Sequence, residues 1–297
     1  MEEQQEEELR REWNAVQDRI AAAVRIPNVS FDNDVVPDQP RFERLCKCVM
    51  CREASSLLPR FERHVVDENR QVLEACVKAI PGLRYVAGVD ISETVCVMVV
   101  LDLHNLEQVC CVETWASEED LQVPYVPGYL AFREYPMVAR CVAKLQMLRP
   151  ELMNEMMLMI DGNGLWHPKG AGLACHVGVQ CDLPTVGVAK NLYEIKGITK
   201  AALQEARAAP HADTPAHVVL HAVANDGQRL GAAIYPVGPA KNPVFASAGH
   251  RVSLDVAILV TVWCMKYRVP EPTRLADQIG RALVRARQAD LATTPLV

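Results

Sequence analysis

Apolar positions near the N-terminus follow a helical period. The residues that recur every three or four positions are Leu9, Trp13, Val16, Ile20 and Val24. This spacing places them on one face of an α-helix and predicts an amphipathic helix over residues 7–26. Residues 27–39 are polar and contain two prolines, which indicates a loop. Residues 40–64 favour no element, and a second helical period predicts a helix over residues 63–79.

From residue 83 onward, short β-rich segments alternate with helical ones. The predicted strands are residues 83–91, 95–103, 108–114, 156–160, 185–189, 217–224 and 229–235. The predicted helices are residues 133–148, 170–181, 199–208, 253–265 and 272–288. The first three strands have short connections, as in an antiparallel meander, and β-α units follow them. We therefore predict an α/β fold with a mixed sheet flanked by helices.

The same pattern predicts how the chain is divided. An N-terminal helix takes residues 1–27, residues 28–70 form a linker or insert to which the sequence assigns no role, and a domain spans residues 71–290 before a tail at 291–297. The chain has 297 residues, of which 50% are hydrophobic and 23% charged, with a net charge of −6. This composition excludes a disordered or collagen-like chain and a protein that binds nucleic acid through a uniformly basic surface.

The charge is uneven along the chain. Residues 1–12 hold six glutamates and two arginines, whereas residues 262–297 hold six basic and three acidic residues. The C-terminal stretch is compatible with a phosphate-binding face and with an ordinary solvated helix face, and the sequence leaves both open. The apolar runs at 95–101 and 256–265 are too short to span a bilayer, so no membrane association is expected.

Cysteine usage indicates a reducing compartment. Eleven cysteines, an odd number, occur without a signal peptide, which favours an intracellular protein in the cytoplasm or the nucleus, including the nucleolus. Cys46, Cys48 and Cys51, with His64 downstream, are compatible with a zinc site or with reduced thiols. Cys175 precedes a histidine directly, but neighbours on a helix do not face each other, so we expect no catalytic Cys–His pair there.

Four segments carry residues suited to catalysis. Asp90 and Asp161 each lie at the end of an apolar strand, and ligands of open sheets gather at the carboxyl ends of parallel strands. Glu134 lies in the first turn of a predicted helix, after a loop stiffened by two prolines, and His250 ends a short strand. Taken singly, each has a structural explanation: a turn for the aspartates, a favourable helix dipole for Glu134 and a buried structural histidine.

Together, five motifs resemble the endonuclease V family of inosine-directed nucleases. They are GVDIS (88–92), PYVPGYLAFRE (124–134), DGNGLWHPKGAGLACHVGV (161–179), PTVGVAKNL (184–192) and SAGHRVSL (247–254). Their order and spacing agree with the family over about residues 83–275. The resemblance implies a ribonuclease H-like fold.

The resemblance also implies roles for individual residues. The metal-binding acids of the family fall on Asp90, Glu134 and Asp161, and its active-site histidine and lysine fall on His250 and Lys190. The family's strand-wedging tyrosine falls on Tyr125, flanked here by Pro124 and Pro127. The pocket for a flipped base, with a histidine near the bound strand, falls on Gly128, Leu130, Gly162, His167, Gly172 and Leu173.

Oxygen ligands without a thiolate suit Mg²⁺, with Mn²⁺ as a substitute. The expected reaction is metal-dependent cleavage of inosine-containing nucleic acid one nucleotide 3′ of the inosine linkage, which leaves 5′-phosphate and 3′-hydroxyl ends. RNA is slightly favoured as the substrate, and DNA, as in DNA repair, is the alternative. The sequence leaves two other functions open, a non-catalytic reader of inosine and a general structure-specific nuclease. We expect a monomer.

Overall fold

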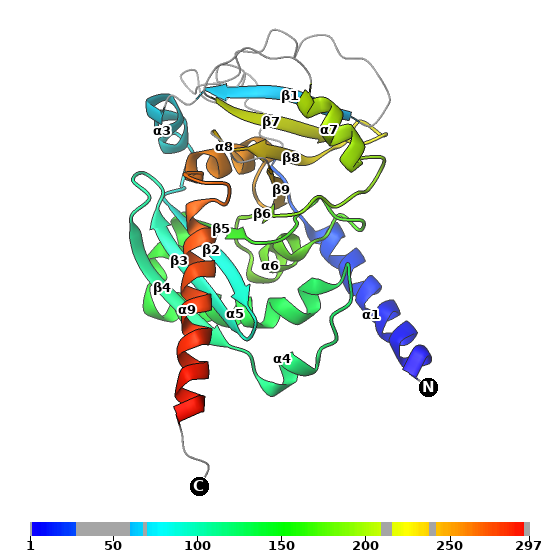
Figure 1. Ribbon diagram of the computed structural model, residues 1–297, viewed down its shortest axis with the longest axis vertical. Coiled ribbons are helices and arrows are strands. Elements are labelled where there is room, and N and C mark those ends of the chain that lie inside the picture. Colours follow the sequence, from blue (N-terminus) through cyan, green and yellow to red (C-terminus); the bar gives the residue numbers. More distant parts are fainter. Residues whose placement is uncertain (1, 28–59, 68–69, 209–215, 238–241, 294–297) are drawn as a thin grey trace.

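The computed structural model describes residues 2–27, 60–67, 70–208, 216–237 and 242–293. A nine-stranded sheet runs through this part of the chain, with helices on both faces (Figure 1). Its strands are β1 (Arg60–Asp67), β2 (Tyr85–Ser92), β3 (Val95–Asp102), β4 (Gln108–Trp115), β5 (Met156–Ile160), β6 (Thr185–Ala189), β7 (Ala216–Val223), β8 (Arg229–Tyr235) and β9 (Val244–His250). The spatial order is β1-β7-β8-β9-β6-β5-β2-β3-β4.

The helices enter between and after these strands. They are α1 (Glu2–Ala23), α3 (Arg70–Lys78), α4 (Glu118–Gln122), α5 (Leu130–Leu148), the 3₁₀ helix η2 (Pro150–Glu155), α6 (Leu173–Cys181), α7 (Lys200–Ala208), α8 (Leu254–Cys264) and α9 (Glu271–Thr293). None of the helices in the described residues has the length and apolar character that a membrane span requires.

The centre of the sheet is parallel, and its flanks are antiparallel. β2 pairs in parallel with β5, and β5 pairs in parallel with β6. β3 and β4 complete an antiparallel meander with β2, while β9 runs antiparallel to β6. The mixed α/β fold predicted from the sequence is confirmed. The carboxyl ends of β2, β5 and β6 consequently meet at one edge of the sheet.

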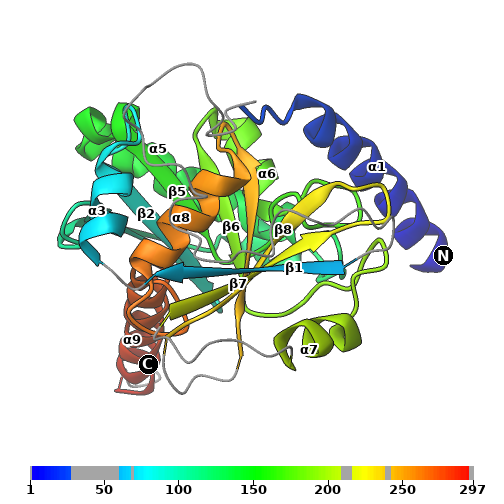
Figure 2. The same cartoon turned by 90° about the horizontal axis from the view of Figure 1, so that it is seen from above.

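Apolar side chains cover both faces of the sheet. On one face, valines of β3 pack with α3, α8 and α9, and on the other, Met98, Leu158 and their neighbours pack with α5 and α6. Helix α8 is buried nearly throughout, since it is apolar on all sides. Helix α1 lies along α6 at the side of the molecule, where Ile20 packs against Ala171 and Cys175 (Figure 2).

The approach of α9 to the sheet depends on a glycine. A Cβ atom on Gly88 of β2 would lie 2.0 Å from the carbonyl carbon of Pro272, in the first turn of α9. No side chain fits this space, so only glycine lets the helix start so close to β2. Side chains alternate along a strand, so Gly88 and Asp90 face the same helix.

The region around residue 70 differs from the prediction in one element and one border. Residues 63–79 do not form one helix, because β1 ends at Asp67 and α3 begins at Arg70. β1 pairs with β7 at the edge of the sheet, so the sheet starts ahead of residue 71, the border that the sequence predicted. An edge strand needs only one apolar face, and the few apolar residues of this segment did not distinguish strand from helix.

Candidate active site

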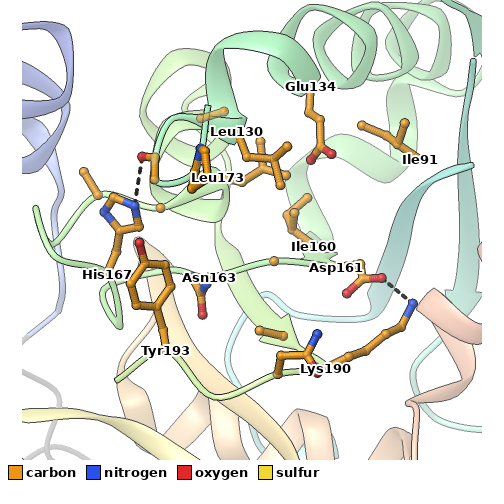
Figure 3. Close-up of a pocket in the computed structure, with 18 of the residues that line it drawn as sticks. Ile91, Leu130, Glu134, Ile160, Asp161, Asn163, His167, Leu173, Lys190 and Tyr193 are labelled. Atoms are coloured by element: carbon orange, nitrogen blue, oxygen red, sulfur yellow. Dashed lines mark hydrogen bonds and ion pairs between the residues drawn. The ribbon is translucent and has the colours of Figure 1, made fainter. Parts of the chain in front are cut away.

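Polar side chains at the ends of the three parallel strands line one cavity. Asp90 lies near the end of β2, Asp161 directly follows β5, and Lys190 directly follows β6. All three line a cavity of about 700 Å³, and Glu134 of α5 lines it as well. The three distant acidic residues predicted to share one site thus line one cavity, and Figure 3 shows Glu134, Asp161 and Lys190 on the same side of it.

Lys190 connects two of the acids. Its Nζ atom lies 2.5 Å from Oδ2 of Asp161 and 3.7 Å from Oδ1 of Asp90. Ser92 donates a hydrogen bond of 3.0 Å to the other oxygen of Asp90. Burial lowers the pKa of Lys190, but the two aspartates outweigh it, and the net effect raises this pKa above its ordinary value. The lysine is therefore held charged.

The acids also influence one another. Burial raises the pKa of Asp90 to about 7, aided by Asp161, while Lys190 opposes the shift. Burial likewise raises the pKa of Glu134 to about 8, and Asp161 and Asp90 contribute through repulsion. Several carboxylates gathered in a poorly solvated cavity cost free energy unless a proton or a cation neutralises them.

The donor chemistry of the cavity fits a hard divalent cation. The side chains that would hold it offer carboxylate oxygens and no thiolate. As they stand, no three acidic, histidine or cysteine side chains in the described ranges are close enough to hold one ion. Lys190 is the cation between Asp90 and Asp161 in this arrangement, so an ion would take its place only after side-chain rotations.

A fourth acid, which the sequence reasoning missed, belongs to this cluster. Asp277 of α9 raises the pKa of Asp90 and also that of Lys190 by electrostatic interaction. Its Oδ1 atom is 2.8 Å from a guanidinium nitrogen of Arg281. The sequence contained one signal for it. Thr273, Ala276 and Gly280 form a face of small residues on this helix, and Asp277 lies beside them.

His250, the predicted active-site histidine, lies outside the cavity, and the structure does not bring it together with the other predicted site residues. It pairs with Thr185 at the start of β6, whereas Lys190 follows the other end of that strand. Five residues of strand put the two roughly 15 Å apart. The imidazole is 1% exposed, and its Nδ1 atom accepts a hydrogen bond from the backbone N–H of Arg25. It is a buried structural histidine.

The far end of the cavity contains the predicted base pocket. Its lining includes Pro127, Gly128, Leu130, Gly162, His167, Gly172 and Leu173. Figure 3 shows His167 and Tyr193 at the end opposite Glu134, Asp161 and Lys190. Tyr125 lies at the mouth with 65% of its surface exposed, and Pro124 is not part of the lining. Backbone and apolar groups thus shape one end, and charged groups occupy the other.

Two other predictions concern cysteines. Cys175 is fully buried in α6, and burial raises the pKa of its thiol to about 12, which agrees with the expectation that it is no nucleophile. The cluster of Cys46, Cys48 and Cys51 lies outside the described residues. Sequence reasoning also missed Gln17 and Tyr193, which line the cavity from α1 and from the segment after β6.

Comparisons with known proteins agree with this arrangement. A sequence model described as Endonuclease V matches residues 67–278. The chain is 34% identical over 247 residues to mouse Endonuclease V, covering 80% of this chain and 70% of the mouse protein. It is 36% identical over 233 residues to human Endonuclease V, covering 76% of this chain and 80% of the human protein.

Solved structures resemble the whole fold. The catalytic domain of human Endonuclease V superposes with a TM-score of 0.70 at 29% identity, covering 95% of this chain and 98% of that domain. Endonuclease V of Ciona intestinalis, in complex with a 23mer DNA containing an inosine followed by a ribo-adenosine, gives a TM-score of 0.68 at 25% identity, with 94% and 98% covered. These neighbours confirm the ribonuclease H-like fold class. The chain belongs to the endonuclease V family and is an endonuclease.

Proposed function

We propose that this endonuclease cleaves inosine-containing nucleic acid with the help of Mg²⁺, for which Mn²⁺ can substitute. The cut lies one nucleotide 3′ of the inosine linkage and leaves 5′-phosphate and 3′-hydroxyl ends. One observation carries the proposal: a single cavity joins a cluster of acids and a lysine to a pocket of glycines and apolar side chains. A strand that places its base in the pocket brings a phosphate to the acids.

The residues at the acidic end have distinct tasks. Asp90, Glu134 and Asp161 would hold the divalent cation, and Asp277 adds negative potential beside them. Bound Mg²⁺ would supply Lewis acidity and lower the pKa of an attacking water. Lys190, charged and partly buried, can neutralise the charge that builds on the phosphate oxygens in the transition state. With His250 outside the cavity, the carboxylates remain the groups able to orient that water.

The other end of the cavity supports the choice of base. Hypoxanthine lacks the 2-amino group of guanine, so a tight pocket can exclude guanine sterically. It differs from adenine at N1–H and O6, and leaving a buried backbone group unpaired against adenine costs about 1–3 kcal/mol. Flipping an inosine out of a duplex is also easier than flipping a well-paired base. Exposed Tyr125 is placed to fill the gap left in the stack.

We favour inosine-containing RNA over DNA as the substrate. The Ciona intestinalis relative was crystallised with an inosine followed by a ribonucleotide, which supports a site that accepts ribose at that position. DNA is the alternative within the same chemistry. A non-catalytic inosine reader would bind such strands in EDTA and cut none in Mg²⁺. A general structure-specific nuclease would cut mismatches, flaps and inosine sites at similar rates.

The test uses single-stranded RNA and DNA oligonucleotides that carry either one inosine or one guanosine at the same position. Each is incubated with the protein in Mg²⁺, Mn²⁺, Ca²⁺ or EDTA. We expect cleavage of the inosine strands in Mg²⁺ or Mn²⁺ and none in EDTA, with loss of cleavage in Asp90→Ala and Asp161→Ala. Mapping the product ends gives the cleavage position. Equal cutting of the guanosine strands would refute the inosine pocket.

A further inference from the structure

Helix α1 contributes a side chain to the cavity. Gln17 is a polar residue with only 2% of its surface exposed, and it lines the cavity although the family match begins at residue 67. The same face of α1 packs against the start of α5, where Trp13 stacks on Phe132 at a centroid distance of 4.8 Å. Tyr129 donates a hydrogen bond of 3.0 Å to Asn14. Helix α1 is thus part of the pocket wall.

The amide of Gln17 acts on one backbone carbonyl. Its Nε2 atom donates to the Gly128 oxygen at 2.7 Å, and Nε2 of His167 lies 3.1 Å from the same oxygen. Nδ1 of His167 accepts from the backbone N–H of Lys169 at 3.3 Å, so the ring proton is on Nε2 and donates to Gly128. A carbonyl oxygen has two lone pairs, and two donors satisfy both of them.

The peptide group that carries this oxygen is one that could otherwise rotate. Gly128 has a positive φ of 85°, and a Cβ atom there would have only the Tyr193 hydroxyl within 4 Å, at 3.6 Å. Glycine is free to leave such a conformation because it has no side chain to oppose the change. The N–H of this peptide group, that of Tyr129, donates to the Val126 oxygen at 2.9 Å, and the hydrogen bonds from Gln17 and His167 hold the carbonyl side of the group in its orientation.

A satisfied acceptor matters for the choice of base. Guanine differs from hypoxanthine by one hydrogen-bond donor, the 2-amino group, and a donor buried without an acceptor is unfavourable. We propose that Gln17 is a positioning residue for specificity, which occupies and fixes the Gly128 carbonyl so that the pocket offers no acceptor to a 2-amino group. This inference rests on the proposed inosine-directed function and names a residue that enforces it.

The test compares Gln17→Leu and Gln17→Glu with wild type and with Arg19→Gln, a change at an exposed position on the same helix. Leucine removes the donor, and glutamate keeps the size of the side chain but presents an acceptor to the carbonyl. For each protein, kcat/KM is measured on single-stranded RNA with inosine or guanosine at one position, together with the melting temperature. We expect the preference for inosine over guanosine to fall about tenfold or more in both Gln17 variants, because one hydrogen bond is lost.

The outcomes separate this inference from the proposed function. A wild-type protein that prefers inosine and Gln17 variants that cut guanosine relatively better, with Arg19→Gln unchanged, would support the inference. An unchanged preference in the Gln17 variants, with both substrates slowed equally or only a lower melting temperature, would overturn it and leave the proposed function standing. A wild-type protein without any preference for inosine would overturn both. If Gln17→Leu does not fold, Gln17→Glu alone decides.

Discussion

The Nζ atom of Lys190 lies 2.5 Å from the Oδ2 atom of Asp161, at the edge where the three parallel strands end. The ammonium group thus stands where a divalent cation between Asp90 and Asp161 would stand, and it has 33% of its side-chain surface exposed. Lys190 can leave this position without crossing a packed core. We therefore expect it to compete with a metal ion for the same carboxylates and to become available to a phosphate once displaced.

Replacing Lys190 is expected to change metal binding and cleavage in opposite directions. In Lys190→Met we expect tighter binding of Mn²⁺ to the free protein, since the competing charge is gone, and a cleavage rate lower by about 100-fold, since a transition-state charge loses its partner. Titration of Mn²⁺ and single-turnover cleavage measure the two effects. Lys144→Met is the control, because this lysine of α5 pairs with Glu113 of β4, away from the cavity. Weaker Mn²⁺ binding in Lys190→Met would contradict the competition.

Asp277 is expected to act with the acids that the sequence identified. Asp277→Asn removes a negative charge beside Asp90 and Lys190, so we expect cleavage to slow by about 10²-fold while inosine-strand binding in Ca²⁺ changes little. The matched control is Asp226→Asn, an exposed turn residue outside the cavity. If Asp277→Asn cleaves at a rate within threefold of wild type, a difference of about 0.7 kcal/mol in activation free energy, Asp277 does not contribute to cleavage.

The raised pKa values predict how stability depends on pH. The pKa values of Asp90 and Glu134 are raised to about 7 and about 8, so in the folded protein without metal these two groups bind more protons than in the unfolded chain between about pH 4 and pH 8. Their contribution to the free energy of unfolding falls as the pH rises through this window, and above about pH 6.5 the buried histidines, whose pKa values are lowered, no longer oppose it. Glu134→Gln removes one of these ionisations.

In EDTA, Glu134→Gln should raise the melting temperature at about pH 8 by about 2–6 °C and change it little at about pH 5, where the native glutamate is already protonated. Differential scanning calorimetry at both pH values measures this. Added Mg²⁺ should stabilise the wild type at the higher pH and the variant less. An equal shift at both pH values would mean that packing, and not ionisation, explains the effect.

His250 is expected to matter for stability and not for chemistry. His250→Ala leaves a cavity between β9 and the end of α1 and removes the acceptor for the Arg25 N–H, so the melting temperature should fall by about 3–8 °C. Below that temperature, we expect kcat/KM within about threefold of wild type and a pH–rate profile of the same shape, since loss of an essential base alters that shape. If the pH–rate profile of His250→Ala lost its rise or its fall, His250 would have a catalytic role.

Tyr125 is expected to matter most on duplexes. Its exposed ring stands at the mouth of the cavity, and a wedge contributes only where a base stack must be opened. Tyr125→Ala should lower kcat/KM on double-stranded inosine substrates by about tenfold more than on single strands, with Tyr267→Ala, another exposed tyrosine, as the control. Equal losses on both substrates would argue against a wedge.

Much of the fold followed from periodicity and strand composition. The meander β2–β4 and the apolar strands β5 and β6 lie where the sequence predicted them, because strands buried on both faces are apolar throughout. The start of α5 did not follow, since the helix begins at Leu130 and not at residue 133. Glu134 is therefore beyond the first turn, where the helix dipole no longer explains an acid.

Strand direction decided which of the predicted site residues the structure brings together. Asp161 and Lys190 follow strands that run parallel, and their motifs put them at one edge. His250 also ends a strand, but β9 is antiparallel to β6, so its carboxyl end points to the opposite edge. Sequence spacing does not report that reversal. Nor does it report which helix packs over β2, which is why Asp277 was missed.

The close packing of α9 against Gly88 has a consequence for assembly of the site during translation. The acidic cluster draws on Asp90, early in the sheet, and on Asp277, in the last helix described, and it is complete only when that helix has docked. A growing chain on the ribosome exposes three of its carboxylates well before the fourth has been translated. The cluster is therefore incomplete until translation has passed α9 and this helix has docked against β2.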